Sequence, residues 1–297
     1  MSGPARPRRR AVDYSVTQEA TLLPFLRETL TGKSRNNVKS LLTRKLVAVD
    51  GHPTSQHDLP LKPGQVVTIL PVSAPAVSGL SFPILYEDER LIAVNKPAGL
   101  LSVGNERERV KTAYRKVSDY VKSRDINAKI FVVHRLDRET SGVLIFAKDP
   151  DTQKAFQKHW NDIVTRRGYY AVVEGAPKPA EDTVVSHLIE TATHLVFSGQ
   201  PGLNSRRAVT HYRTMAAGHG YALLDVSIDT GRKNQIRVHM QDIGHPVAGD
   251  RQYGAKTNPL GRLCLHACEL SLTDPVTGKA LSFVARMPKE FSKLVNT

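Results

Sequence analysis

The sequence lacks several features that would assign it quickly to a class of protein. Only two of its 297 residues are cysteines, Cys264 and Cys268. They are too few for a disulfide framework and are typical of a reducing compartment. No apolar run approaches the ~18 residues that a membrane-spanning helix needs, and the basic start, MSGPARPRRR, is not followed by the apolar stretch of a signal peptide. We therefore expect a cytoplasmic protein without a membrane partner.

Motifs for cofactors are also missing. There is no Gly-x-Gly-x-x-Gly sequence and no phosphate-binding loop with its lysine. Cys264, His266 and Cys268 alternate along one strand-like segment, but no fourth ligand at zinc-like spacing accompanies them. The sequence thus predicts neither a nucleotide cofactor nor a metal.

Acidic residues are in the minority. Lysine and arginine together number 42, against 28 aspartates and glutamates, which gives a formal net charge of +14. Such an excess points to a polyanionic partner. Nucleic acid is the first candidate, because the chain has no amphipathic basic helix of the kind that binds anionic membranes.

Composition divides the chain into a small front part and a large rear part. Residues 71–83, PVSAPAVSGLSFP, have the composition of a linker. The net charge is +6 over residues 1–83 and +8 over the much longer remainder, so positive charge is denser in front. We predict a basic flexible tail over residues 1–16, a small α+β domain over 17–72, a linker over 73–83 and a large domain over 84–297.

The front part contains a segment with charge of one sign. Residues 31–45, TGKSRNNVKSLLTRK, fit a helix that Ser34 could cap. A charge run is most often a solvated helix face, but positive charge along a whole helix without an acid favours contact with phosphates. The expected RNA-binding residues of this segment are Lys33, Arg35, Lys39, Arg44 and Lys45.

In the rear part, predicted strands outnumber predicted helices and several are joined by short turns. This pattern is typical of an α+β domain with a mixed, mostly antiparallel central sheet and flanking helices. Asp149 and Pro150 are expected to cap and begin one helix, and a second helix is expected within TGRKNQIRVHMQDIGHP.

One segment of the rear part, HRLDRETSGVLIFAK, sets Asp137 between Arg135 and Arg138, just before an apolar strand. A nearby guanidinium should keep the carboxylate ionised and lower its pKa. An ionised, oriented carboxylate can act as a nucleophile or a base, although a structural Asp–Arg pair is the more common arrangement. Spacing alone predicts that Arg237 faces solvent and that Tyr169 is a packing residue.

Five segments, in order, resemble the Rlu-type RNA pseudouridine synthases. The Asp137 segment resembles the family signature His-Arg-Leu-Asp, two residues, Thr-Ser-Gly, then a strand ending Ala-Lys. The other four are LYEDERLIAVNKPAGL, RGYYAVVEG, TGRKNQIRVHMQDIGHPVAGDRQYG, and RLCLHACEL with TGKALSFVARMP. The front part is similar to the small RNA-binding domain named after ribosomal protein S-four.

The resemblance implies isomerisation of a uridine within RNA to pseudouridine by one aspartate, Asp137, with Arg135 in the same signature. It maps a second arginine, which pairs with the aspartate, to Arg237 and a base-stacking tyrosine to Tyr169. Arg232 and Lys233 are expected to contact RNA. The target uridine would flip out of the folded RNA, and we expect a monomer that acts on ribosomal RNA more than on transfer RNA.

The resemblance leaves some points open. Lys233 and Asn234 stand where the family often has Thr-His or Ser-His, which affects substrate choice more than chemistry. Whether Asp137 attacks the sugar or removes a ribose proton is undecided. A non-catalytic RNA-binding or ribosome-assembly protein is the alternative function, and a glycosidase-like enzyme would need a second, paired acid that is not evident.

Overall fold

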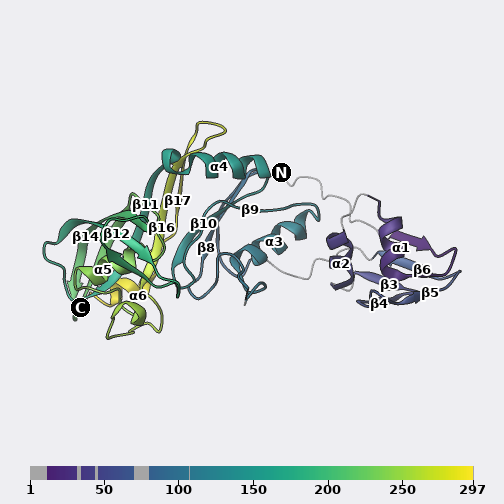
Figure 1. The fold of residues 1–297 in the computed structure, drawn as a ribbon, viewed down its shortest axis with the longest axis horizontal. Helices are drawn as coiled ribbons and strands as arrows, with labels where there is room; N and C mark the ends of the chain where they lie inside the picture. The colour runs from purple at the N-terminus through teal and green to yellow at the C-terminus, as the bar shows by residue number, and fades with distance from the viewer. Residues whose placement is uncertain (1–11, 32–34, 44–45, 70–79, 107, 297) are drawn as a thin grey trace, which may run out of the picture. The chain divides into compact units, whose positions relative to one another are not determined.

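The computed structural model describes residues 12–31, 35–43, 46–69, 80–106 and 108–296 (Figure 1). The chain separates into two compact units, Met1–Ser78 and Gly79–Thr297. None of the helices within the described ranges is long and apolar enough to cross a membrane.

The front unit packs two short helices against a four-stranded antiparallel sheet with the strand order β1-β6-β3-β4. Its core joins Leu22 and Leu26 of the first helix to Val38 and Leu42 of the second, together with Val67 of the sheet. The elements are β1 (Val12–Ser15), β2 (Ala20–Thr21), α1 (Leu22–Thr29), α2 (Arg35–Thr43), β3 (Val47–Val49), β4 (His52–Thr54), β5 (Pro60–Leu61) and β6 (Val66–Ile69).

The predicted boundary of the flexible tail at residue 16 is wrong. Residues Val12–Ser15 form β1, which pairs with β6 so that Val12 lies opposite Ile69. Tyr14 and Val16 pack against the core of the unit. The alternation of Val12, Tyr14 and Val16 is the period-2 pattern of a half-buried strand. Residues 1–11 and the predicted helix cap Ser34 lie outside the described part of the chain.

The large unit is built on an eleven-stranded sheet. Nine strands follow the order β13-β12-β14-β15-β11-β16-β10-β8-β7, while β17 pairs with β16 and β9 pairs with β10. Every described pair is antiparallel except β10 with β16, which confirms the predicted α+β class with a mostly antiparallel sheet. The strands are β7 (Ile84–Glu87), β8 (Leu91–Lys96), β9 (Phe131–Val132), β10 (Ser141–Ala147), β11 (Val164–Glu174), β12 (Glu181–Glu190), β13 (Val196–Gly199), β14 (Ser205–Gly218), β15 (Tyr221–Ile228), β16 (Leu265–Thr273) and β17 (Ala280–Val284).

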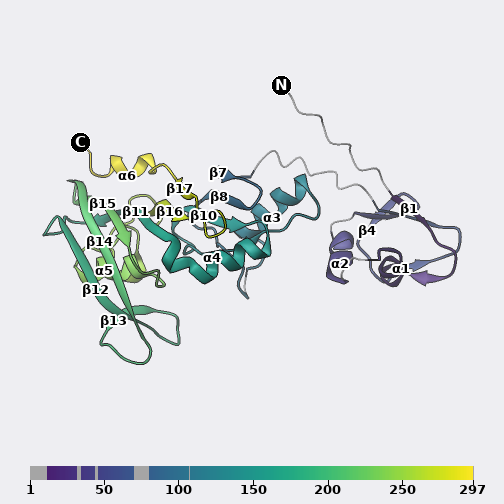
Figure 2. The same ribbon diagram turned by 90° about the horizontal axis from the view of Figure 1, so that it is seen from above.

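Helices cover one half of this sheet on the side of β8 and β10 (Figure 2). The helix α3 (Ala113–Arg124) begins at Thr112, whose hydroxyl accepts the Arg115 N–H at 3.0 Å. The helix α4 (Pro150–Ile163) begins after Asp149, whose carboxylate accepts the Thr152 N–H at 2.8 Å. A carboxylate cap followed by proline is a strong start signal, and the predicted start of this helix is confirmed.

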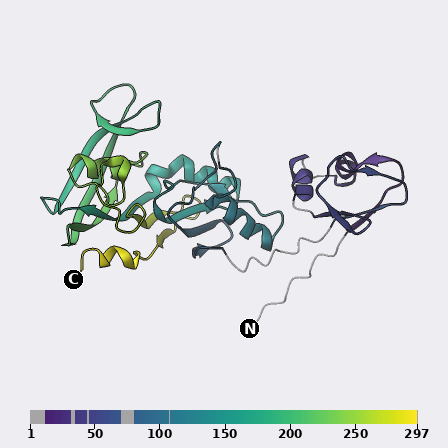
Figure 3. The same cartoon turned by 90° about the horizontal axis from the view of Figure 1, so that it is seen from below.

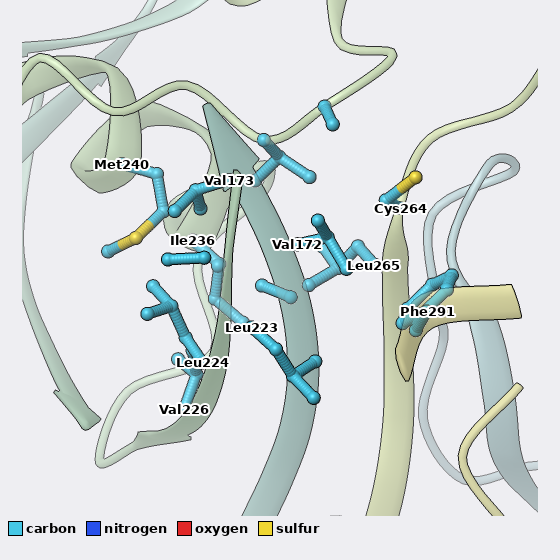
Figure 4. Close-up of a cluster of buried hydrophobic side chains, with 14 of the residues drawn as sticks. Val172, Val173, Leu223, Leu224, Val226, Ile236, Met240, Cys264, Leu265 and Phe291 are labelled. Atoms are coloured by element: carbon cyan, nitrogen blue, oxygen red, sulfur yellow. The ribbon is translucent and has the colours of Figure 1, made fainter. Parts of the chain in front are cut away.

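In the other half of the sheet, α5 (Gln235–Asp242) and α6 (Lys289–Lys293) pack on opposite faces (Figure 3). Ile236 and Met240 of α5 meet one side of the strands, and Phe291 of α6 meets the other (Figure 4). A short helical turn, η1 (Arg251–Tyr253), follows α5. The buried contacts of Ile236 and Met240 set the rotation of α5, and hence where its polar side chains lie.

Candidate active site

The loop that carries Asp137 is held on both sides of that residue. Ser102 accepts the backbone N–H of Leu136 at 3.0 Å and donates its hydroxyl to the Leu136 carbonyl at 2.7 Å. The Thr140 N–H donates to the Asp137 carbonyl at 3.2 Å. A loop tied to the scaffold in this way can present a side chain in one fixed place.

Two residues of the Thr-Ser-Gly part of the signature, Ser141 and Gly142, are explained by their contacts with neighbouring segments. Gly142, the second residue of β10, lies beside Ala267 of β16, in the parallel pair of the sheet, with φ +117°. A Cβ at this position would lie 2.0 Å from the Ala267 carbonyl oxygen, so only glycine fits. The preceding Ser141 hydroxyl is 2.8 Å from His266 Nδ1 and accepts a hydrogen bond from Arg262 at 2.7 Å. The strand after Asp137 is thereby locked to β16.

Asp137 lies in the wall of a cavity of about 90 Å³ at the N-terminal end of α5. This cavity brings together five residues that the sequence predicted for the site: Arg135, Asp137, Tyr169, Arg232 and Arg237. Its remaining lining is Leu136, Thr140, Ile228, Gly231, Asn234, Gln235, Ile236 and Leu265. Because the segments come from four distant stretches of the chain, only the fold places them together.

The expected lowering of the Asp137 pKa is wrong, because burial raises the pKa of this half-buried carboxyl group. Arg237, Lys96, Lys233 and Arg135 oppose this rise through their charges. No side chain or backbone group of the described residues donates a hydrogen bond to the Asp137 carboxylate. Desolvation without such bonds favours the neutral acid.

The arginines that flank Asp137 in sequence do not pair with it. Arg138 donates its Nε–H to the Gly99 carbonyl at 3.1 Å and lies 3.5 Å from the Glu139 carboxylate. Arg135 is exposed, although it lines the cavity. Neighbours along an extended loop point in different directions, so adjacency in the sequence did not predict contact in space.

Arg237 is buried, contrary to the solvent-facing position that its spacing indicated, with a relative exposure of 9%. It forms a bidentate ion pair with Asp250, at 2.6 Å from Nε and 2.7 Å from Nη2. The pairing with Asp137 that the resemblance implied is therefore absent from the structure. Asp250 occupies the guanidinium in its place, because its carboxylate offers two fully buried acceptors in the plane of the two N–H groups.

Tyr169 lies within β11, which begins at Val164. The register against β16 shifts between Gly168 and Tyr169, an irregularity of the kind that re-aims side chains near active sites. Burial raises the pKa of the Tyr169 hydroxyl to about 12. The ring therefore presents a neutral aromatic face to the cavity.

The predicted RNA-binding residues fall into three groups. Arg232 lines the cavity and donates to the Arg207 carbonyl at 3.2 Å, whereas Lys233 is held by the Glu190 carboxylate at 2.6 Å. Arg35 and Lys39 are exposed on α2 of the front unit. The other three, Lys33, Arg44 and Lys45, lie outside the described residues.

Sequence reasoning missed Lys96, a fully buried lysine beneath the Asp137 loop. Its ammonium group donates to the carbonyls of Pro97 at 3.1 Å, Leu100 at 2.7 Å and Arg138 at 3.1 Å. Burial lowers its pKa to about 8, and Asp137 opposes that shift. A lysine at the end of an apolar strand, just before Pro-Ala-Gly, was the available signal.

Asp250 was missed as well. It follows Gly249 in the segment GDRQYG and is 2% exposed. Nothing in the sequence shows that it would reach Arg237, because both residues lie in one long polar segment whose loop path is not predictable. Cys264, His266 and Cys268 form no metal-binding group, and the described residues contain no cluster of three or more His, Cys, Asp or Glu side chains placed to hold a metal.

Comparison with known proteins gives a consistent result. Residues 90–242 match the family described as RNA pseudouridylate synthase. The chain is 28% identical over 287 residues to ribosomal large subunit pseudouridine synthase D of Neisseria meningitidis, covering 91% of this chain and 76% of the relative. It is 34% identical over 227 residues to tRNA pseudouridine synthase C of Pectobacterium carotovorum, covering 68% of this chain and 58% of the relative.

A solved structure shares the fold. Human RNA Pseudouridylate Synthase Domain Containing 4 aligns with 70% of this chain and 90% of its own, with a TM-score of 0.58 and 24% sequence identity.

Proposed function

The chain belongs to the RNA pseudouridylate synthase family, an isomerase family that acts on RNA, and on that premise we propose that it converts uridines of structured RNA to pseudouridine with Asp137 as its single essential acid. The observation that carries the proposal is the cavity that Asp137 shares with Tyr169 and Arg237. The carboxylate there is free of protein hydrogen-bond donors among the described residues, so its oxygens are available to a substrate.

The reaction needs no second acid. The bond between N1 of uracil and C1′ of ribose breaks, the base turns, and a bond forms between C5 and C1′. The proton lost from C5 is balanced by the hydrogen that N1 carries in the product, so no water is consumed. Asp137 either attacks C1′ or removes a ribose proton, and both roles require the ionised form. The charges of Arg237, Lys96, Lys233 and Arg135 favour that form.

Tyr169 supplies the surface on which the flipped uracil stacks. Base–aromatic stacking contributes roughly 1–3 kcal/mol per base, which offsets the few kcal/mol that extrusion from a stack costs. The cavity of about 90 Å³ is small for a nucleotide, so binding must displace side chains at its mouth. Arg135 is exposed and lines the cavity, so we expect its side chain to move when the nucleotide binds.

We propose ribosomal RNA as the substrate and the front unit as an S-four-like domain that holds it. One relative named for the ribosomal large subunit aligns with 91% of this chain, front unit included, and another of that name is 34% identical over 71% of it. Arg35 and Lys39 place two exposed positive charges on α2, with no acid between residues 31 and 45. The cytoplasmic location and the monomeric state stay predictions.

The test is release of tritium from RNA labelled at C5 of uridine. The wild-type protein should release tritium from ribosomal RNA, and Asp137→Asn should not, while both bind the RNA with equal affinity. Glu139→Gln is the matched control, because Glu139 is an acid of the same loop to which we assign no role. Release by Asp137→Asn would overturn the assignment of the acid.

Mapping of pseudouridines in cells that lack the gene decides the substrate. Loss of pseudouridine from transfer RNA alone would contradict the ribosomal assignment. If RNA from these cells is unchanged and the purified protein binds RNA without releasing tritium, the chain is a binding or ribosome-assembly protein that retains the fold.

A further inference from the structure

Asp250 is one of the most buried acids of the chain, and the surrounding backbone fixes its position. It follows Gly249, whose φ is +84° and whose missing Cβ would lie 2.2 Å from the Arg262 carbonyl oxygen. The Asp250 N–H donates to the Val247 carbonyl at 2.9 Å, and the Asp250 carbonyl accepts the Ala255 N–H at 3.0 Å. The carboxylate therefore approaches Arg237 from a backbone that cannot shift easily.

The guanidinium of Arg237 has five N–H donors, and four of them are occupied. The Nε–H and one Nη2–H donate to Asp250, the other Nη2–H donates to Gln252 Oε1 at 3.1 Å, and one Nη1–H donates to Asn234 Oδ1 at 2.9 Å. For the second Nη1–H, the described residues provide no acceptor. One donor of a buried, permanently charged group is left unused.

The plane of the guanidinium is fixed in addition to its hydrogen bonds. Arg237 lies over the ring of Tyr253, with Cζ 4.7 Å from the ring centroid. The Tyr253 hydroxyl in turn accepts the side-chain amide of Asn234 at 3.0 Å. Arg237 and Asn234 both line the cavity that contains Asp137. Rotation of the guanidinium would break several of these contacts at once.

We propose that Asp250 is a positioning residue that holds Arg237 so that its one unused Nη1–H serves the cavity, donating to Asp137 or to a carbonyl oxygen of the bound uracil. The inference rests on the proposed function, because it assigns a donor to that site. The sequence resemblance pairs Arg237 with Asp137, whereas in the structure a different acid, Asp250, pairs with Arg237, stabilises its charge and sets its direction.

A change at Asp250 should alter the proton affinity of Asp137. The charged groups that face Asp137 are Arg237 of α5, Lys96 of β8, Lys233 before α5 and Arg135 of its own loop, and Tyr169 of β11 is the neighbouring neutral group. The negative charge of Asp250 compensates the positive charge of Arg237. Replacing it with asparagine leaves the positive charge of Arg237 without its partner, so the pKa of Asp137 should fall.

The experiment compares Asp250→Asn and Asp250→Glu with the wild type. The Asp137 carboxyl is titrated by NMR in the RNA-free full-length protein labelled with ¹³C-aspartate, its signal being assigned by its loss in Asp137→Asn. Asp274→Asn is the matched control, because it also removes a buried aspartate from an arginine pair, and neither Asp274 nor Arg90 lines the cavity.

In Asp250→Asn the pKa of Asp137 should fall, while in Asp274→Asn it should stay at the wild-type value. An unchanged or higher pKa of Asp137 in Asp250→Asn would overturn the proposal. This titration does not depend on catalysis, so it tests the electrostatic link between Asp250, Arg237 and Asp137 even if the proposed isomerisation fails in the tritium assay, whereas the direction of Arg237 is tested by Asp250→Glu.

Asp250→Glu covers the case in which the asparagine variant does not fold. Glutamate keeps the charge but moves the guanidinium by about 1 Å, and a misplacement of that size can cost about 100-fold in rate. We expect kcat to fall by between about 10- and 100-fold, with an unchanged affinity for RNA and an unchanged pKa of Asp137. A kcat equal to that of the wild type would show that the direction of Arg237 does not matter.

Discussion

Two aspartates with arginines nearby, the half-buried Asp137 and the buried Asp274, behave in opposite ways in this protein. Asp274, in the turn between β16 and β17, forms an ion pair with Arg90 and accepts hydrogen bonds from Val276 N at 2.9 Å and Thr277 Oγ1 at 2.7 Å. These bonds lower its pKa to about 2 despite burial. Asp137 has cationic neighbours but no donor among the described residues, and burial raises its pKa.

The comparison indicates that direct hydrogen bonds, including those from Arg90 to Asp274, lower the pKa of a carboxyl group here, whereas cationic groups that donate no hydrogen bond to it do not offset its desolvation. Coulomb attraction at a distance does not replace the water that a carboxylate loses on burial, whereas direct donors do. Asp274 contributes to stability. Asp137 is held in a costly environment with its oxygens unused, which is the usual condition of a group reserved for a substrate.

The largest effect is expected from replacing Asp137 by asparagine. Asp137→Asn should lower activity at least about 100-fold without lowering the melting temperature at pH 7. The reason is that a folded-state pKa above the unfolded value of 3.8 makes the ionised form a cost to folding at neutral pH. Thermal unfolding at pH 7 and near pH 3, where that cost disappears, measures it, and a melting temperature well below wild type at pH 7 would contradict the explanation.

Lys96→Met should show what supports the Asp137 loop. It leaves three buried carbonyls, those of Pro97, Leu100 and Arg138, without a donor. We expect the free energy of unfolding to fall by roughly 2–4 kcal/mol, together with a loss of activity. In the wild type, folded Lys96 loses its proton above about pH 8 while the unfolded chain keeps it to about 10.5.

The cost of holding the Lys96 charge should therefore be relieved between about pH 8 and pH 10.5. Denaturant unfolding across this range measures the difference between the two proteins. A difference in stability that is constant with pH would show that Lys96 is not buried as a charged group.

Asp274→Asn should have the smaller effect on stability and none on catalysis. Breaking a buried pair can cost 3–5 kcal/mol, and because Arg90 is partly exposed we expect about 2–3 kcal/mol. A lowered pKa means that the stabilisation is present above pH 3.8 and is lost as the pH falls toward about 2. Urea unfolding at pH 7 and at low pH measures both the loss of stability and its dependence on pH. Reduced tritium release by the folded variant would contradict the expectation that catalysis is unaffected.

Variants of Tyr169 test whether its aromatic ring or its hydroxyl group contacts the substrate. Tyr169→Phe keeps the aromatic face and should change activity little, since the neutral hydroxyl has no role in our proposal. Tyr169→Ala should lose the stacking free energy of the uracil, about 1–3 kcal/mol, and this loss should be measured as a lower kcat/KM. Equal losses in the two variants would indicate that the hydroxyl, and not the ring, acts on the substrate.

The smallest effect is expected from the front unit, which carries neither aspartate. Arg35→Ala with Lys39→Ala should reduce the dependence of RNA affinity on salt by roughly 0.7–0.9 in the slope for each lost phosphate contact, and should leave kcat unchanged. Lys62→Ala removes one exposed charge from outside α2 and serves as the control. Filter binding over a series of salt concentrations measures the slope of log affinity against log salt concentration. An unchanged slope would show that Arg35 and Lys39 of α2 do not contact RNA phosphates.

Much of the architecture could be predicted from local patterns. The start of α4 at Asp149 and Pro150 and the mostly antiparallel sheet follow from capping and alternation, which act between near neighbours in the sequence. The strand at Val12–Ser15 was missed although its alternation was visible, because a basic, proline-rich start masked it. Gly142 was part of the predicted signature, but its contact with Ala267 was not predictable.

The sequence by itself determined which chemical groups the protein has and the order in which they occur, including a single aspartate in a loop before a buried strand. The tertiary structure alone decided that Arg237 pairs with Asp250, that Lys96 lies under the loop, and that Asp137 is desolvated without donors. Proton affinity depends on burial and on distances between groups far apart in the chain. These quantities exist only once the chain has folded.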